Sequence, residues 1–466
     1  MKRMLLITGL MVIMLPLITG CPGLAIDGRP PEYSVCNPSM LPDGSGGVIV
    51  AYQVNRGNSG SIYLQRLGAD GNFLWDESGI ELSTTQWGFL SGNIECVSLV
   101  SDDKGNFIAV YPSIDGLKVR KLTMEGDSIW PNDEVRVFTG ITSLGDFKAA
   151  GDSSGGVVIA RSTQDSIELQ RIDGDGDLLW NTNIPVEVDR FDIVVDAIGN
   201  TFVIWKDNPS YSEGDIFVQM VDTDGTIAWL TGGVQLTDEE NPGFRRGSFD
   251  HRIISDGNGG VLCTWSEVIH SEDGRHITGQ RLYAQRISRK GEILWESGGV
   301  LITGTEWLEE PCIIESDPGS ILVVWEDIHR IYKQKLDLFG NMTWPGDSLE
   351  IMRIDEIMYY SVTSDGSGGA VLVWNYTDRK KRYVGAQHMN TDGSNLWGDG
   401  GIKVSTVSPY WAEYSVPARI LPDGTGGFVI SWASGKNIKD STSSYIQRVS
   451  AEGELLWGED GIKLGP

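Results

Sequence analysis

The sequence predicts an all-β protein, a single β-propeller of eight four-stranded blades, with seven blades as the alternative. A glycine-rich phrase returns along the 466-residue chain, for example as SDGNGGVLCTW (255–265) and PDGTGGFVISW (422–432). A tryptophan follows a second turn in every copy, and the copies lie about 50 residues apart, the size of a four-stranded blade. No helical periodicity separates the copies. The eight tryptophans are Trp75, Trp130, Trp180, Trp229, Trp295, Trp344, Trp397 and Trp457.

One copy, residues 360–405, shows the order of the predicted strands. YSVTSD (360–365) alternates as a half-buried strand does, and the turn GSGG follows it. AVLVW (370–374) is apolar on both faces, which is typical of a central strand. YVGAQHM (383–389), the hairpin turn TDGS and a segment ending in GIKVS complete the unit. Counted in this way, the chain begins with an inner strand and ends with an outer one. The ring then closes by packing alone, unless the strand order is offset.

Two further residue types recur at fixed places in the copies. The second strand ends in Tyr or Trp in seven copies, with Arg161 as the exception. The third strand carries Gln in seven copies, with Arg120 in the eighth. A tryptophan in every blade at once indicates packing between sheets rather than a ligand platform, and the glutamine is expected to bond to backbone. Both columns are interpreted as structural.

The first 21 residues predict export and lipid anchoring. MKRMLLITGLMVIMLPLITGC has two basic residues and an apolar run too short to span a bilayer, and it ends in the letters ITGC at Cys21. These four letters resemble a bacterial lipobox, in which the cysteine is lipidated. An ordinary cleaved signal with a chance cysteine is the alternative. We expect a chain that is exported and lipid-anchored at the cell membrane or cell surface, with a lipoprotein signal peptide, a lipidated tether and an eight-repeat propeller domain at residues 1–20, 21–32 and 33–466.

Composition limits the expected partners. The formal net charge is −27, and such a surface repels nucleic acid, whose phosphates bind to basic stripes. Four cysteines follow Cys21 without CxxC spacing or paired histidines, so a zinc site is not expected. Each lies in an apolar, strand-like run and is interpreted as a small buried residue, although an exported chain permits disulfides. They are Cys36, Cys96, Cys263 and Cys312.

The phrase that joins the third and fourth strands resembles that of a known type of propeller. YLQRLGADGNFLW (63–75), YAQRISRKGEILW (283–295) and YIQRVSAEGELLW (445–457) resemble the PQQ-type repeats of quinoprotein-like proteins, in which a turn glycine precedes a docking tryptophan. A bacterial lipoprotein with eight such repeats also resembles the β-propeller subunit of outer-membrane assembly machinery. The resemblance implies the propeller fold. The residues that would hold a quinone are not found, so no such cofactor is expected.

The candidate binding surface is formed by the loops between second and third strands and between successive blades, because these loops vary most in length. Aromatic residues there can stack on sugars or hold a partner chain, and inward packing between blades is the alternative. His251, His270 and His276 also lie in this region, and they are interpreted as solvated because their spacings match no metal-ligand pattern. The tentative ligand-binding residues are Trp87, Trp307, Tyr410 and Trp411.

Chemical motifs are sparse in the sequence. Asp173, Asp175 and Asp177 alternate as at the start of a calcium loop, but the closing glutamate is absent, so calcium is a weak candidate and no other cofactor is expected. No H-E-x-x-H or P-loop motif occurs. The prediction is a non-catalytic, lipid-anchored propeller that binds or scaffolds a protein or glycan of the cell envelope. The alternatives are a secreted glycan hydrolase with paired carboxylates and a structural subunit of an envelope complex.

Overall fold

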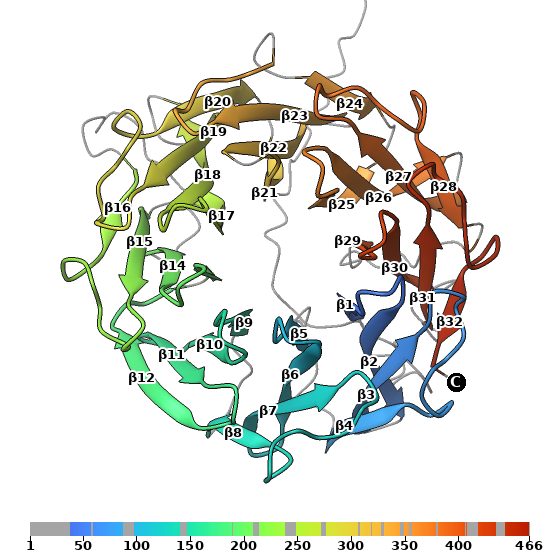
Figure 1. Ribbon diagram of the computed structural model, residues 1–466. Helices are drawn as coiled ribbons and strands as arrows, with labels where there is room; N and C mark the ends of the chain where they lie inside the picture. The colour runs from blue at the N-terminus through green and yellow to red at the C-terminus, as the bar shows by residue number, and fades with distance from the viewer. Residues whose placement is uncertain are drawn as a thin grey trace, which may run out of the picture.

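The computed structural model shows an all-β ring of eight four-stranded antiparallel sheets (Figure 1). This confirms the predicted eight-bladed propeller and excludes the seven-bladed alternative, since each sheet is made of four consecutive strands. The part of the chain that the structure describes contains no helix, and so none that could cross a membrane. It comprises residues 38–56, 59–86, 97–139, 147–188, 190–207, 214–237, 248–271, 276–305, 308–317, 319–327, 330–344, 349–353, 357–378, 381–405, 407, 418–434 and 443–465.

All blades share one strand order from the centre of the ring outward. The innermost strands are β1 (Ser39–Pro42), β5 (Ser98–Ser101), β9 (Phe147–Gly151), β13 (Phe191–Val195), β17 (Ser248–Ser255), β21 (Glu309–Glu315), β25 (Ile357–Ser364) and β29 (Arg419–Pro422). The second strands supply most of the buried apolar core. They are β2 (Val48–Arg56), β6 (Asn106–Ser113), β10 (Val157–Ser162), β14 (Thr201–Lys206), β18 (Val261–His270), β22 (Ser320–Asp327), β26 (Ala370–Asp378) and β30 (Phe428–Ser434).

The third and fourth strands form the outer part of each blade. The third strands are β3 (Ser59–Leu67), β7 (Gly116–Thr123), β11 (Ile167–Ile172), β15 (Ile216–Val221), β19 (Ile277–Ile287), β23 (Arg330–Asp337), β27 (Lys381–Met389) and β31 (Ser443–Val449). The fourth strands are β4 (Ile80–Gln86), β8 (Val135–Phe138), β12 (Leu178–Ile184), β16 (Val234–Gln235), β20 (Val300–Thr305), β24 (Leu349–Arg353), β28 (Ile402–Ser405) and β32 (Ile462–Leu464).

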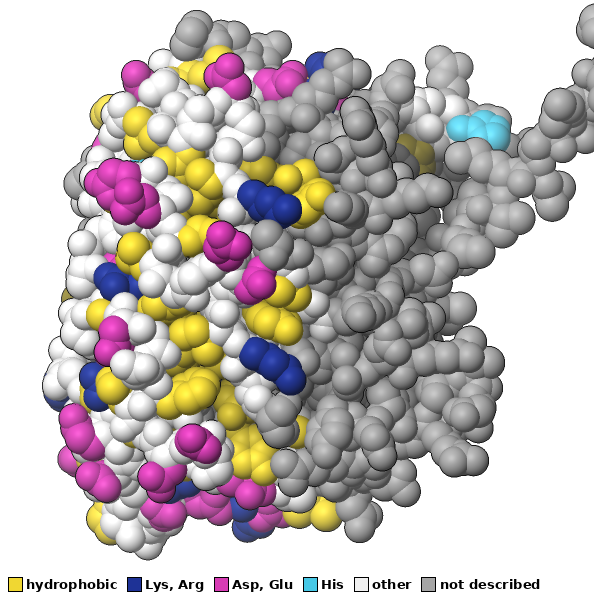
Figure 2. All heavy atoms as spheres, turned by 90° about the vertical axis from the view of Figure 1, so that its right-hand side faces the viewer, with side chains coloured by type: hydrophobic (Ala, Val, Ile, Leu, Met, Phe, Trp, Pro, Cys, Tyr) yellow, Lys and Arg dark blue, Asp and Glu magenta, His cyan; other side chains and the backbone are white. Residues whose placement is uncertain are grey.

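Figure 2 shows the outer wall on the side of β28 and β32, where hydrophobic, acidic and basic side chains are intermixed.

Aspartate and glycine build the turn between the first and second strands. In blade 5, Asp256 Oδ1 accepts hydrogen bonds from the backbone N–H groups of Asn258 and Gly260, both at 2.8 Å. A Cβ atom on Gly260 would lie 2.3 Å from the carbonyl oxygen of Ile287, so only glycine fits there. The repeated glycine-rich phrase is therefore a turn. Equivalent bonds are made by Asp43, Asp102, Asp152, Asp196, Asp365 and Asp423.

The repeated tryptophan joins each blade to the next one. In blade 3, the Trp180 indole donates a hydrogen bond of 3.0 Å to the carbonyl oxygen of Thr223 in blade 4. The ring lies on Gly225, which has a φ of +82°, and a Cβ atom there would come within 2.6 Å of Trp180. This confirms that the tryptophan column serves packing between blades. The corresponding glycines in the eight turns are Gly71, Gly126, Gly176, Gly225, Gly291, Gly340, Gly393 and Gly453.

A basic side chain on the third strand ties the first turn of its own blade to the outer turn of the next blade. Arg448 Nε donates to Asp423 Oδ2 in blade 8 at 2.7 Å, and Arg448 Nη1 donates to the carbonyl oxygen of Ala69 in blade 1 at 3.0 Å. These contacts fix the face that carries both kinds of turn, which we call the turn face; the opposite face is the loop face. The other Arg or Lys pairs with the first turn are Arg66–Asp43, Lys121–Asp102, Arg171–Asp152, Arg286–Asp256 and Lys335–Asp317, and His388 contacts Asp365 at the same place.

The ring closes without a shared blade. Blade 1 consists of β1 to β4 and blade 8 of β29 to β32, so the predicted strand order is not offset. Trp457 and Arg448 both donate to the Ala69 carbonyl oxygen at 3.0 Å. Apolar side chains of blades 1 and 8, including Val50 and Val429, pack in one buried cluster beside Trp457. Side-chain packing and hydrogen bonds thus hold the first and last blades together.

Candidate functional site

The innermost strands carry a polar position in the same register of every blade. In blade 5, Arg252 pairs with Thr264, which directly precedes the buried Trp265. The equivalent register in the other blades holds serine, cysteine or a charged residue, and all eight are half-buried, whereas the next residue along each strand is apolar. We call this set the inner ring. It consists of Ser39, Ser98, Lys148, Asp192, Arg252, Cys312, Ser361 and Arg419.

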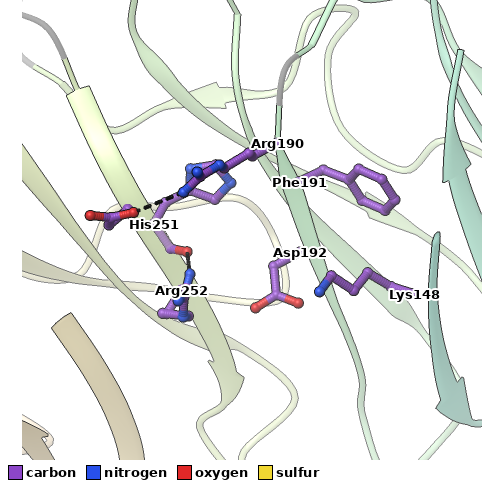
Figure 3. Close-up of a pocket in the computed structure, with 7 residues that line it drawn as sticks. Lys148, Arg190, Phe191, Asp192, His251 and Arg252 are labelled. Carbon is purple, nitrogen blue, oxygen red and sulfur yellow. Dashed lines mark hydrogen bonds and ion pairs between the residues drawn. The ribbon is translucent and has the colours of Figure 1, made fainter. Parts of the chain in front are cut away.

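Charge and a cavity coincide in blades 3 to 5. Three consecutive inner-ring residues there are charged, and they line a cavity of about 350 Å³. The lining residues lie at or just before the beginning of β9 and β13 or in the middle of the longer strand β17. Because these strands run toward the turn face, the cavity lies at their loop-face end. The lining residues are Lys148, Arg190, Phe191, Asp192, Asp250, His251 and Arg252 (Figure 3).

Two contacts hold one side of the cavity. The Arg190 guanidinium donates to Asp250 Oδ1 at 3.1 Å, and Arg252 Nη1 donates to the carbonyl oxygen of His251 at 3.0 Å. Opposite them, Lys148 extends its ammonium group toward the Asp192 carboxylate (Figure 3). The three blades therefore present three cationic and two anionic side chains to one small space.

His251 is neutral at the edge of this charged group. Its side chain is only 5% exposed. Burial, followed by the positive charges of Arg252 and Arg190, lowers the pKa of His251 from 6.5 to about 3. Since the imidazole carries no charge at pH 7, the lining residues have a net charge of about +1, in a chain whose formal charge is −27. The cavity is thus a local exception to the acidic character of the protein.

The predicted aromatic binding residues lie outside the described residues, as does the predicted lipidation site Cys21. Among the histidines, His276 is exposed, as expected, but His251 is buried in β17. The interpretation of His251 as solvated is therefore wrong, because strand β17 begins before it and carries its side chain inward. Cys36 and Cys96 are also outside the described residues, whereas Cys263 is buried, Cys312 is half-buried and neither forms a disulfide. The aromatic residues concerned are Trp87, Trp307, Tyr410 and Trp411.

The calcium candidate occupies the turn between the third and fourth strands of blade 3. Asp173 Oδ1 accepts backbone hydrogen bonds from Asp175 and Asp177, both at 2.9 Å, so the first carboxylate serves the turn itself. Within the described ranges, no three His, Cys, Asp or Glu side chains gather as a metal site would require. The turn explains the alternation of these aspartates without a bound ion.

Sequence analysis missed the residues that line the cavity. Lys148, Asp192 and Arg252 are about 50 residues apart, and only the register of the innermost strands shows that they are equivalent. A usable signal was present, because Lys148 and Asp192 are the charged residues of the otherwise apolar stretches FKAAG and FDIVV. The length variation of the loops drew attention to the loop face, where the cavity lies, but not to these residues of the innermost strands.

Comparison with known proteins finds similar solved structures only at low identity. No protein-family model matches the chain, and no curated protein matches it. Among solved structures, an ulvan lyase of polysaccharide lyase family PL25, bound to -[GlcA(1-4)Rha3S]-, has a TM-score of 0.48 at 10% identity and covers 91% of this chain and 96% of its own. Prolyl oligopeptidase B from Galerina marginata has a TM-score of 0.43 at 10% identity, covering 91% of this chain and 56% of its own. Puromycin hydrolase has a TM-score of 0.44 at 13% identity, covering 80% and 54%.

These comparisons correct one prediction. The protein was predicted not to be an enzyme, because catalytic motifs are missing from its sequence. Solved structures similar to this chain include a polysaccharide lyase and peptidases. The prediction is therefore wrong, because neither a propeller fold nor a lack of catalytic motifs excludes an enzyme. At 10% to 13% identity, the similarity itself concerns the fold alone, and this chain is shown to be an eight-bladed β-propeller.

Proposed function

We propose that this protein is an exported, lipid-anchored propeller that binds a glycan or protein of the cell envelope at the loop-face end of its innermost strands. Cys21, in its lipobox-like context, would carry the anchor. The PQQ-type resemblance of the repeats supports the scaffold and not a quinone site. Nucleic acid is not proposed as a partner, since the formal charge of −27 disfavours phosphate backbones.

The observation that carries this proposal is the cavity between blades 3, 4 and 5. On the turn face, the repeated polar residues are engaged in construction, as the bonds of Asp423, Arg448 and Trp457 illustrate. At the other end of the innermost strands, charged side chains from three blades converge on about 350 Å³ of open space. A concave site with a few convergent polar groups is the usual form of a ligand site.

A second candidate function is hydrolysis of a glycan. Asp192 and Asp250 both line the cavity, and a pair of carboxylates flanking one sugar bond is the minimum for glycoside hydrolysis. Asp250 accepts a hydrogen bond from Arg190, so Asp192 is the carboxylate left to act as the general acid. Turnover of a captured glycan that disappears in Asp192→Asn would support this function, and binding without turnover would leave the first one.

The test uses the full chain purified in detergent and mixed with envelope glycans and envelope proteins. We expect specific capture by the wild-type chain and loss of capture in the double variant Lys148→Met, Arg252→Met. A second variant, with Trp87, Trp307 and Trp411 all changed to alanine, measures what the predicted aromatic residues add. Equal capture by the wild-type chain and both folded variants would contradict binding at the loop-face end.

A further inference from the structure

We propose that the cavity between blades 3, 4 and 5 binds an acidic sugar, with its carboxylate held by Lys148 and the guanidinium groups of Arg190 and Arg252. This inference rests on the proposed function and narrows its ligand from a glycan or protein to a glycan that carries uronic acid residues. Three features of the cavity lead to it: the sign of its charge, the character of its lining, and the state of its histidine.

The sign of the charge favours an anion. Lys148, Arg190 and Arg252 line the space together with two carboxylates, and one of these, Asp250, is already bonded to Arg190. A guanidinium has five N–H donors in a planar fork that matches a carboxylate, and the bond to Asp250 uses one donor of Arg190. With the Arg190–Asp250 pair set aside, Asp192 carries the other negative charge of the lining, and the two cations Lys148 and Arg252 outnumber it.

The range of this attraction is short. The whole chain carries a formal charge of −27, which repels polyanions at a distance, but salt limits such fields to about 8 Å at physiological ionic strength. A ligand that presents single carboxylates to the cavity therefore meets a positive site once it is close. A densely charged polymer such as a nucleic acid is repelled by the surrounding acidic surface. This arrangement favours short acidic oligosaccharides over long polyanions.

The lining favours a sugar over a protein anchor. Of the seven lining residues, six are charged or ionisable. The seventh, Phe191, is only 3% exposed, so its ring is part of the blade core and not an open apolar surface. Protein partners are usually anchored by large apolar or aromatic side chains in desolvated pockets, and this cavity offers no such surface. Hydroxyl and carboxylate groups are better matched to it.

The neutral histidine limits the charge of the cavity. His251 lines the cavity and is held uncharged by burial and by neighbouring cations. At 5% exposure, its ring belongs to the wall, as that of Phe191 does, so contacts with a ligand are left to the charged side chains. The net charge of the lining therefore stays near +1, which suits a sugar that brings one carboxylate into the cavity.

The experiment measures binding of tetragalacturonate to the full chain in detergent by isothermal titration calorimetry. Lys148→Met is expected to weaken binding about tenfold, as loss of a charge-assisted contact does. Asp192→Asn removes the opposing negative charge and is expected to strengthen binding several-fold. Damage to the fold cannot produce that second result. Lys290→Met makes the same change of charge on the exposed turn between β19 and β20, on the turn face, and is expected to leave binding within twofold of the wild-type value.

Two ligand controls separate the possible results. Tetragalactose lacks the carboxylates and is expected to bind at least tenfold more weakly, and tetraglutamate tests whether any acidic chain suffices. Equal binding of tetragalacturonate and tetragalactose, or equal effects of Lys148→Met and Lys290→Met, would overturn the inference, as would tighter binding of tetraglutamate. If envelope glycans are still captured in these cases, the proposed function stands and only the acidic ligand is wrong.

Discussion

Buried His251 makes the stability of the propeller depend on pH in a defined window. In the unfolded chain a histidine takes up its proton near pH 6.5, whereas in the folded protein the pKa of His251 is about 3. The unfolded state therefore binds more protons throughout the interval between these values. Stability is fully present above pH 6.5 and is lost progressively as the pH falls toward 3. Protonation of the folded form is opposed first by burial and then by Arg252, Arg190, Lys206 and Lys148.

The size of the effect follows from the two pKa values. Each pH unit in this window is equivalent to about 1.4 kcal/mol, so lowering the pH from 7 to 5 should reduce the free energy of unfolding by about 2 kcal/mol through His251 alone. The carboxylates with lowered pKa values add little in this range. Although burial alone would raise the pKa of Asp102, bonds from Asn106, Lys104 and Lys121 lower it to about 2, so its contribution is lost only in stronger acid.

Urea titrations at pH 5, 6 and 7 measure this dependence. We expect His251→Gln to remove about 2 kcal/mol of the pH dependence seen in the wild-type chain, whatever its effect on stability at pH 7. His276→Gln is the matched control, because His276 is exposed, and it should keep the wild-type slope. An unchanged slope in His251→Gln would refute the conclusion that His251 is neutral and buried in the folded protein.

Three further predictions concern the scaffold. Gly225→Ala places a Cβ atom within 2.6 Å of Trp180, whereas Gly398→Ala, at a similar φ of +78°, meets no atom within 4 Å. Gly225→Ala should therefore lower the melting temperature more than Gly398→Ala does. Equal losses would show that the contact between blades is unimportant. His388 lies 2.9 Å from Asp365 Oδ2 and 3.4 Å from the Ala451 carbonyl oxygen. His388→Arg should raise the free energy of unfolding at pH 8 by about 1 kcal/mol, since a permanent cation can bond to both. No gain would show that this pair contributes nothing to stability. Millimolar calcium should leave the melting temperature within about 1 °C, because Asp173 already accepts two backbone bonds; a clear rise would reinstate calcium.

Repetition made the fold predictable from the sequence. The strands and turns of each blade can be predicted from the sequence of its own copy, and the spacing of Trp180 and Trp229 gives the length of a blade directly. The register also agrees with the expected roles of the repeated residues. Gln285 Nε2 donates to the Glu296 carbonyl oxygen at 2.8 Å, as expected for a glutamine that bonds to backbone. Eight local agreements of this kind reinforce one another, so the number of blades could be predicted, whereas ring closure by packing was one of two alternatives that the sequence left open.

The site was less predictable, because it arises between blades and not within one copy. Lys148, Asp192 and Arg252 come together only when the ring has formed, and the sequence of a single copy does not predict that they line the same cavity. His251 shows the same limit. The sequence placed it at the end of a loop, whereas β17 already begins at Ser248, and His251 and Ile253 are buried on the same side of this strand.

Hydrogen–deuterium exchange of the full chain, with and without envelope glycan fragments, tests the location of the site most directly. We expect slower exchange in peptides that contain residues 190–194 and 248–253, which carry the cavity, because a bound ligand suppresses local opening of these strand ends. Peptides that contain the turns at 222–226 and 288–292, on the turn face, should be unchanged. Protection of those turns, with no change at 190–194 and 248–253, would show that the ligand does not bind at the cavity.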